Sequence, residues 1–442
     1  MRRFSALLLM ISVVSPVGAW PWIDEVVSYN PGPGQFQGVF RDPSRMLGRP
    51  YGVSVSEADN QSVITLGDGG NVTVRFLTPI HNDSRNPQGL DFIVFSNSIW
   101  SGGDKTRRWQ EAAFVEISQD AANWSLILPN ILPANLIVPP AANPDIGMSR
   151  TILRGYAEYS PTMGLPEMVR PEEFYTVPDR PSYASDPNSL SIDDGSGGGD
   201  AFDIGWAVRE TSPGVPETDN NGQPILANLA WISYVRLTDA RVGDTLGSLG
   251  EVSAEIDAVA AVMPAVQRLG ASLLESDQAI VRVEDVVVVR TFGVDSAFVH
   301  SADQSCGTVI SGVSGVQPGQ KLRVVGKLHH SAVGASIEVF FFDVLSSGPV
   351  PHPITVSVAS LVSRQHLSPA GMVVKILGRV KHTDVLEEFV LEDANGQSVR
   401  VMTPFGRPGE GSLAKVTGGT INGVSETTLQ VQSRSDVIIA AP

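Results

Sequence analysis

The stretch of this chain best suited to bind a cation is a glycine-rich acidic run. Residues 193–203 read DDGSGGGDAFD, so carboxylates flank a flexible glycine tract that lets several oxygen atoms converge. Calcium takes about six to eight such oxygens at roughly 2.3–2.6 Å. The spacing fits no EF-hand loop and resembles a calcium-binding β-roll repeat only in part. The run can therefore be interpreted either as a calcium site or as an exposed acidic loop in which Asp203 caps a turn.

A second acidic set adjoins apolar runs. Asp91 precedes FIVF, Asp257 lies within EIDAVAAV beside Glu255, and Asp68 lies in LGDGG. A carboxylate buried in such a strand is costly unless a donor, an arginine or a metal compensates it. We expect either backbone amides or a shared ion at Asp91 and Asp257.

Catalysis on a glycosidic bond would need a pair of carboxylates, and Glu111 and Glu116 are the candidates. A five-residue offset in a strand places them on opposite faces, which argues against a simple pair. His81 is the only histidine before residue 265, so a three-histidine zinc site is excluded there. A carbohydrate-active hydrolase or lyase is thus the alternative rather than the leading function.

Aromatic side chains offer another way to bind a sugar. All seven tryptophans precede residue 265, and most should pack in a core. Trp100, next to Ser101-Gly102-Gly103, is the one that we expect to be exposed and to bind a glycan.

The elements that position these residues read as strands. Short β-branched or alternating runs are separated by Gly, Pro, Asn and Asp, without a long amphipathic helix pattern. The runs are 62–66, 72–76, 92–95, 114–118, 231–237 and 256–262. They predict a jelly-roll-like β-sandwich at residues 20–265. The proline-rich stretch 130–219 reads as a long loop over one end of it.

The rest of the chain contains an internal duplication. Phe298-Val299 recurs as Phe389-Val390, Gly319 and Gly326 recur as Gly411 and Gly418, and Asp343-Val344 recurs as Asp436-Val437. Each copy has about five β-rich runs, a number typical of a small OB-like barrel. We therefore expect barrels at 266–346 and 356–442, joined by a proline-rich linker at 347–355. Their combined net charge of −2, and the presence of only Phe389 and Phe405 as aromatic residues in the second copy, argue against nucleic-acid binding and favour spacers or protein-binding modules.

The N-terminal residues and the net charge of the chain indicate where the protein is located. Residues 1–19 read as a cleavable signal peptide, with Arg2 and Arg3, an apolar run and a small-residue end. No later run is long enough for a membrane helix, and the net charge of −16 disfavours nucleic acid and anionic lipid. With Cys306 the only cysteine, no intramolecular disulfide can form. We expect a secreted or periplasmic protein, with cell-surface association also open.

Five ordered motifs resemble a family of bacterial secreted and cell-surface proteins, many of which carry a PEP-CTERM sorting tail. They are LGDGG at 66–70, DFIVFSN at 91–97, AFVEISQD at 113–120, GGDAFD at 198–203 and EIDAV at 255–259. The resemblance implies a secreted jelly-roll-like domain without established catalytic residues. It marks Asp91, Asp200, Asp203 and Asp257 as motif positions, and these are the predicted metal ligands. The chain has Ser96 where the family usually has Glu, and it lacks the sorting tail.

The sequence thus predicts an exported, non-catalytic binding or adhesion protein. Calcium is its expected cofactor, and a glycan or another envelope component its expected partner. A protein partner for the OB-like repeats is a further expectation, and a structural surface protein without a small ligand is a further alternative.

Overall fold

The computed structural model describes most of the chain after the expected signal peptide. The described residues are 20–34, 38–51, 61–105, 107–128, 147–149, 155–179, 195–240, 252–331, 334–363, 371–422 and 427–439. Residues 1–19 lie outside them. The chain divides into two compact units, Met1–Met263 and Pro264–Pro442.

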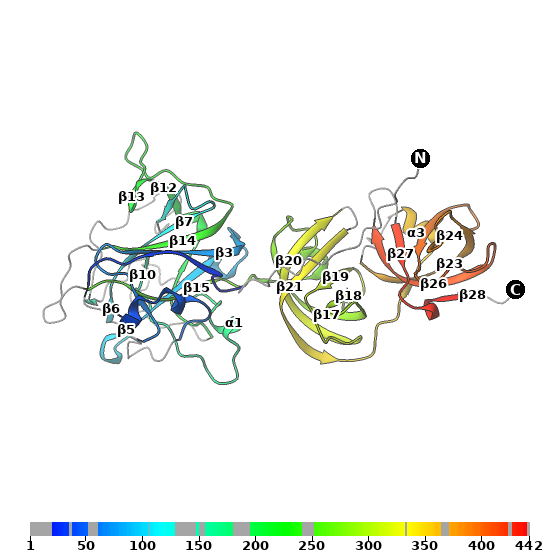
Figure 1. Ribbon diagram of the computed structural model, residues 1–442, viewed down its shortest axis with the longest axis horizontal. Coiled ribbons are helices and arrows are strands. Elements are labelled where there is room, and N and C mark those ends of the chain that lie inside the picture. The colour runs from blue at the N-terminus through cyan, green and yellow to red at the C-terminus, as the bar shows by residue number, and fades with distance from the viewer. Residues whose placement is uncertain are drawn as a thin grey trace. The chain divides into compact units, whose positions relative to one another are not determined.

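The first unit is built on two antiparallel sheets (Figure 1). The larger has the order β1 (Glu25–Asn30), β3 (Asn71–His81), β14 (Trp231–Asp239), β7 (Ala113–Ser118), β8 (Ser125–Ile127), β12 (Ala207–Ser212) and β13 (Val215–Pro216), with β10 (Tyr156–Ala157) beside β7. The smaller has the order β11 (Asp200–Phe202), β4 (Phe92–Ser96), β15 (Glu255–Ala261) and β2 (Ile64–Thr65). A separate three-stranded sheet contains β5 (Ile99–Trp100), β6 (Arg108–Gln110) and β9 (Gly147–Ser149).

Side chains from both sheets share one apolar core, among them Val74, Val115 and Val235 of the larger sheet and Phe92 and Val259 of the smaller. Every residue of β4 and of β15 is buried, so the smaller sheet is covered on both faces. The short helix α1 (Pro171–Phe174) adds Phe174 to the same core. Any carboxylate on β15 is therefore held away from water.

The expectation of a loop over residues 130–219 is wrong for the described part of that stretch. Strand β11 pairs with β4, and β12 pairs with β8, so the stretch contributes to both sheets. Residues 196–199, directly before β11, are buried, whereas Gly195 is exposed and Asp193 and Asp194 lie outside the described residues. A Cβ at Gly199, where φ is +72°, would lie 2.7 Å from the Phe95 ring. Glycine is needed there because the backbone lies directly against that ring.

The second unit contains two closed five-stranded barrels. In the first, β16 (Val266–Gln267) and α2 (Leu269–Ser272) precede β17 (Ile280–Phe292), β18 (Ser296–Ser301), β19 (Gly307–Ser311), β20 (Gln320–Ser331) and β21 (Gly334–Ser347). In the second, β22 (Ile354–Thr355) and α3 (Val358–Ser363) precede β23 (Val373–His382), β24 (Glu388–Glu392), β25 (Ser398–Met402), β26 (Leu413–Asn422), β27 (Thr427–Gln430) and β28 (Val437–Ile439). The predicted all-β class, with a sandwich and two small barrels, is confirmed.

The strand pairing explains the sequence repeat. Strand β19 is parallel to β21, and β25 is parallel to β27 at the matching position. The long β21 of the first copy corresponds to two strands in the second, β27 and β28, because a turn at Arg434–Asp436 interrupts the strand. Val344 pairs with the fourth strand of its barrel, and Val437 does the same in the other barrel.

The two barrels touch through a small mixed interface. The Arg290 guanidinium of the first makes two hydrogen bonds of 2.7 Å to the Asp436 carboxylate of the second. His300 is fully buried and its Nε2 accepts a hydrogen bond from the Val373 amide at 2.9 Å. Burial lowers the pKa of His300 to about 4, so its ring is neutral and able to accept at neutral pH.

The described α-helices have four to six residues, and none of the helices found there could cross a membrane.

We expect Gly419→Ala to loosen the contact between the barrels. A Cβ at Gly419 would overlap the Phe298 ring, which is 1% exposed and packs with Val289 and Val373. Overpacking of this kind costs about 1–3 kcal/mol. Hydrogen exchange followed by mass spectrometry should show faster exchange in peptides from β18 and β26.

Two controls fit this experiment. Gly409→Ala adds a methyl group where nothing lies within 4 Å, so exchange should not change. The urea midpoint for unfolding of the first unit, followed by tryptophan fluorescence, should be the same in both variants, because all seven tryptophans precede residue 265. Unchanged exchange in Gly419→Ala would show that Phe298 can move aside.

Candidate metal centre

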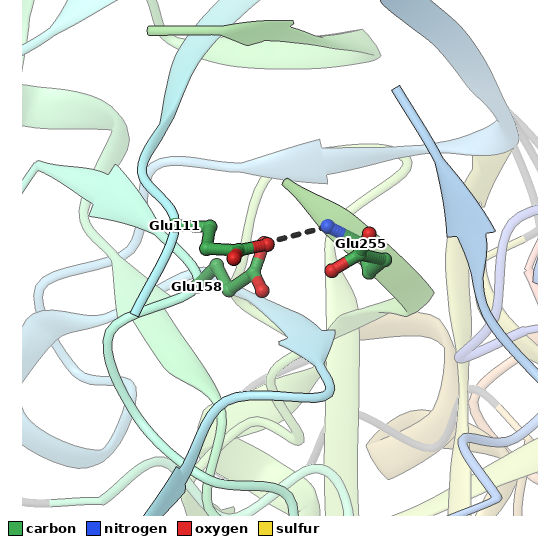
Figure 2. A group of neighbouring side chains, drawn as sticks. All are labelled: Glu111, Glu158 and Glu255. Atoms are coloured by element: carbon green, nitrogen blue, oxygen red, sulfur yellow. Dashed lines mark hydrogen bonds between the residues drawn. The ribbon is translucent and has the colours of Figure 1, made fainter. Parts of the chain in front are cut away.

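Three buried glutamates meet inside the first unit (Figure 2). Glu111, Glu158 and Glu255 each offer a carboxylate oxygen, and these atoms all lie within 4.8 Å of one another. Exposure is 6% for Glu111, 0% for Glu158 and 6% for Glu255. Within the described ranges, no other group of three His, Cys, Asp or Glu side chains meets this distance. We call these three residues the glutamate cluster.

The cluster joins the two sheets. Glu111 lies in the short connection between β6 and β7, and Glu158 directly follows β10. Ala157 of β10 pairs with Ala113 of β7 in an antiparallel arrangement. Glu158, the residue after Ala157, therefore lies beside Ala112 and close to Glu111. Glu255 is the first residue of β15 in the smaller sheet.

Glu158 is held in an unfavourable backbone conformation. Its φ is +67°, in the left-handed region that favours glycine. The Glu255 amide donates a hydrogen bond of 2.6 Å to Glu158 Oε2 (Figure 2). Such strain persists only where the surroundings fix the residue, and it occurs often at functional sites.

The hydrogen-bond donors do not saturate the cluster. Trp109 Nε1 donates to Glu111 Oε1 at 3.1 Å, and side chains of Thr65 and Asn97 hydrogen-bond to Glu255. Glu158 Oε1 and Glu255 Oε1 are buried and have no hydrogen-bond partner. An unpaired oxygen of this kind costs about 1–3 kcal/mol, and more when it is charged.

Electrostatics disfavours three negative charges here. Burial, and then the charges of Glu255 and Glu111, raise the pKa of Glu158 well above its usual value. Burial and the charge of Glu111 do the same to the pKa of Glu255, and burial raises that of Glu111. Among the described residues, no lysine or arginine forms an ion pair with the three carboxylates. Either protons or a cation must therefore neutralise the cluster.

Asp200 belongs to the surroundings of the cluster rather than to its centre. Its Oδ2 accepts hydrogen bonds from the amides of Tyr159 at 2.8 Å and Ser160 at 3.3 Å, which directly follow Glu158. The charge of Asp200 also contributes to the raised pKa of Glu158. The GGDAFD motif thus positions Glu158 through this turn.

The other predicted metal ligands have backbone donors of their own. Asp91 accepts from the amides of Asp83 at 3.0 Å and Ile204 at 2.9 Å, and from Asn86 Nδ2 at 2.9 Å. Asp203 accepts from the Gly205 amide at 2.6 Å. Burial raises the pKa of Asp91 to about 7, and the nearby charge of Asp203 adds to this.

Asp257 accepts from the Tyr51 amide at 2.8 Å. No three of Asp91, Asp200, Asp203 and Asp257 come within the distance that the glutamates meet, judged over the residues described. A calcium ion bound directly by these four aspartates stays a prediction. The amide donors already account for the burial of their carboxylates.

Glu116 is not part of the cluster. It makes hydrogen bonds of 2.7 and 2.5 Å to Arg236, whose guanidinium lies 4.2 Å from the centre of the Trp124 ring. Glu210 Oε2 lies 3.9 Å from the same guanidinium nitrogen that bonds to Glu116. Glu111 and Glu116 thus belong to different side-chain groups.

The expectation of an exposed Trp100 is wrong, because the ring is only 6% exposed. The Ser101–Gly103 turn folds the chain back, so that Trp100 pairs with Arg108 across a hairpin. Lys105 Nζ lies 5.1 Å from the centre of the ring. A sugar therefore cannot stack on an open Trp100 surface.

Sequence reasoning missed Glu158. A signal was present, since it stands in YAEYS, a single acid between two tyrosines that are now seen to be buried. Glu111 and Glu255 were noticed, but in separate roles. Only the pairing of β10 with β7 brings the three together.

Comparisons with known proteins add little to this geometry. No family model matches the chain, and no curated protein does. One similar solved structure is a murine DNA-binding protein bound with double-stranded DNA, at 13% identity and a TM-score of 0.21. The match covers 37% of this chain and 98% of that one, and at this TM-score it carries no argument.

Glu210→Gln should remove a pH dependence from the stability of the first unit. Burial and the charge of Glu116 raise the pKa of Glu210 to about 8, from an ordinary 4.5. Between about pH 4.5 and 8 the folded chain therefore holds a proton on Glu210 that the unfolded chain releases. The contribution of this group to stability is therefore greatest below pH 4.5 and falls as the pH rises to about 8. Tryptophan-monitored melting at pH 5, 6.5 and 8 should show this fall in the wild type and a weaker one in the variant.

Glu167→Gln, a change at an exposed glutamate of the same unit, should keep the wild-type profile. Parallel profiles for Glu210→Gln and the wild type would contradict the assignment.

Proposed function

We propose that this chain is an exported, non-catalytic binding protein whose first unit holds a divalent cation at the glutamate cluster. The observation that carries this proposal is the pair of buried, unpartnered oxygens, Glu158 Oε1 and Glu255 Oε1. They belong to carboxylates that already converge within 4.8 Å.

Calcium is the cation that fits the donor chemistry. Three carboxylates can supply up to six oxygens when each binds through both atoms, and calcium takes about six to eight. Side chains of Thr65 and Asn97 already bond to Glu255 and stand beside the cluster. The absence of histidine and cysteine from the group argues against zinc or copper.

The same geometry argues against hydrolysis. The two carboxyl groups of a glycosidase stand about 5–5.5 or 6.5–9.5 Å apart, on either side of the bond that they cleave. Here three carboxylates converge on one point instead of two facing each other across a bond, and none is more than 6% exposed. A carbohydrate-active hydrolase or lyase is therefore the less favoured alternative function, and a structural surface protein without a small ligand is a second alternative.

Export and partners rest on the sequence. The signal-like residues 1–19 and the bacterial surface-protein motifs support a secreted or periplasmic location, with surface association as the further possibility. A glycan or another envelope component is the proposed ligand. The two barrels are proposed to bind a protein partner.

Calcium should stabilise the first unit. At a concentration of about one hundred times its Kd, a ligand adds about 2.7 kcal/mol to the free energy of unfolding. We therefore expect a rise of several degrees in the tryptophan-monitored melting temperature when calcium is added to chelator-treated protein. Glu158→Gln should abolish the rise, because it removes a charge from the centre of the cluster.

Glu167→Gln is the matched control and should keep the rise. Calorimetry should report about one ion per chain. If millimolar calcium gives no heat of binding and no shift of the melting temperature, the proposed calcium site is excluded. A shift that survives Glu158→Gln but is lost in Asp91→Asn would move the ion to the aspartates.

A further inference from the structure

A second set of unpartnered polar groups lies on the small sheet of β5, β6 and β9. Trp100 and Arg108 are cross-strand partners, so their side chains lie on one face of that sheet. Gln110, two residues along β6, lies on the same face. Trp109 lies on the other face, from which its indole reaches Glu111.

Gln110 is buried without any partner. It is 0% exposed, and neither Oε1 nor Nε2 makes a hydrogen bond. Trp100 Nε1, also buried, has no acceptor. Proteins seldom leave such groups unpaired, since each costs about 1–3 kcal/mol. Something that both donates and accepts hydrogen bonds is therefore expected beside them.

We propose that Trp100 and Gln110 form a subsite for a neutral ligand with adjacent hydroxyl groups, of the kind found on carbohydrates. The proposal rests on the binding function proposed above, but it does not require the cation. The Gln110 amide offers a donor and an acceptor side by side, which matches two neighbouring hydroxyls. The Trp100 indole N–H supplies a second donor.

The charges around the subsite favour a neutral ligand. The Arg108 guanidinium lies on the same face and donates to the Tyr159 carbonyl and Ser160 Oγ, each at 2.9 Å, and Lys105 lies over Trp100. These charges disfavour a cation. The glutamate cluster, which begins one residue after Gln110, disfavours an anion.

The turn that follows Trp100 is the exposed side of the proposed subsite. Lys105 is exposed, and so are Gly102 and Gly103 of the turn that follows Trp100. A lysine side chain is long and flexible, so its ammonium group can leave the ring at small cost. A ligand would therefore use the indole N–H and the Gln110 amide by hydrogen bonding, rather than stack on the indole face.

Two substitutions remove the hydrogen-bonding groups of the proposed subsite. Trp100→Phe removes the indole N–H, and Gln110→Met removes both amide groups at similar volume. Because its unpaired amide groups destabilise the folded chain, we expect Gln110→Met to melt at or above the wild-type temperature. A residue that served the fold alone would give the opposite result. Trp100→Phe also leaves a cavity beside a buried ring, so we expect it to melt lower and use it only to measure binding.

Binding is measured by saturation-transfer NMR and calorimetry with the methyl glycosides of glucose, galactose and mannose, and then with their oligosaccharides. At least one glycoside should bind the wild type. Each variant should weaken that binding about tenfold, the loss of roughly one hydrogen bond. Trp124→Phe is the control and should bind normally, because Trp124 lies beside Arg236 instead.

Binding of no glycoside, or equal binding by the variants, would overturn the subsite. A crystal structure that shows only ordered water on Gln110 after a glycoside soak would do the same. The calcium shift is measured in the same samples, so the two proposals can fail separately. A calcium response without glycoside binding leaves the cation site intact, and the reverse result leaves only the subsite.

Discussion

Carboxylates that are buried together must be neutralised, and the first unit is arranged around that requirement. Glu255 begins a strand that is covered on both faces, and Glu158 and Glu111 approach it from the edge of the other sheet. The positive φ of Glu158 is fixed by the Glu255 amide on one side and by the turn that Asp200 holds on the other. A bound cation would connect the two sheets where no disulfide is available, since Cys306 is the single cysteine.

The glycine tract and the acidic motifs serve this arrangement indirectly. Gly199 lets the chain lie against Phe95, which places Asp200 under the amides that follow Glu158. The motif aspartates that are predicted as metal ligands bind backbone amides and set the path of the chain. These carboxylates order loops by accepting hydrogen bonds from backbone amides, and Asp200 in this way positions Glu158 next to the other two glutamates.

The local pattern of the sequence was enough to predict the longest strands of the first unit, because period-two alternation and β-branched content are local properties. Runs such as 72–76 and 231–237 lie within β3 and β14, and the repeated motifs mark corresponding strands of two barrels. The glutamate cluster could not be predicted this way, since it depends on the pairing of Tyr156-Ala157 with β7, which joins distant segments. The burial of Trp100 was missed because the glycines beside it indicate a turn without revealing which way the hairpin folds.

The contact between the barrels shows how two similar copies became different. Arg290 lies opposite Phe298 in the first copy, and His382 lies opposite Phe389 in the second, so these two residues are equivalent. Arg290 reaches out to Asp436, whereas His382 bonds to Pro408 of its own barrel. Asp343, the counterpart of Asp436, likewise lies 3.6 Å from Arg323 within its own barrel. The first barrel thus supplies the donor of the contact and the second barrel supplies the acceptor. The equivalent residues, His382 and Asp343, interact within their own barrels, so the same contact could not join a third barrel to either end of the pair.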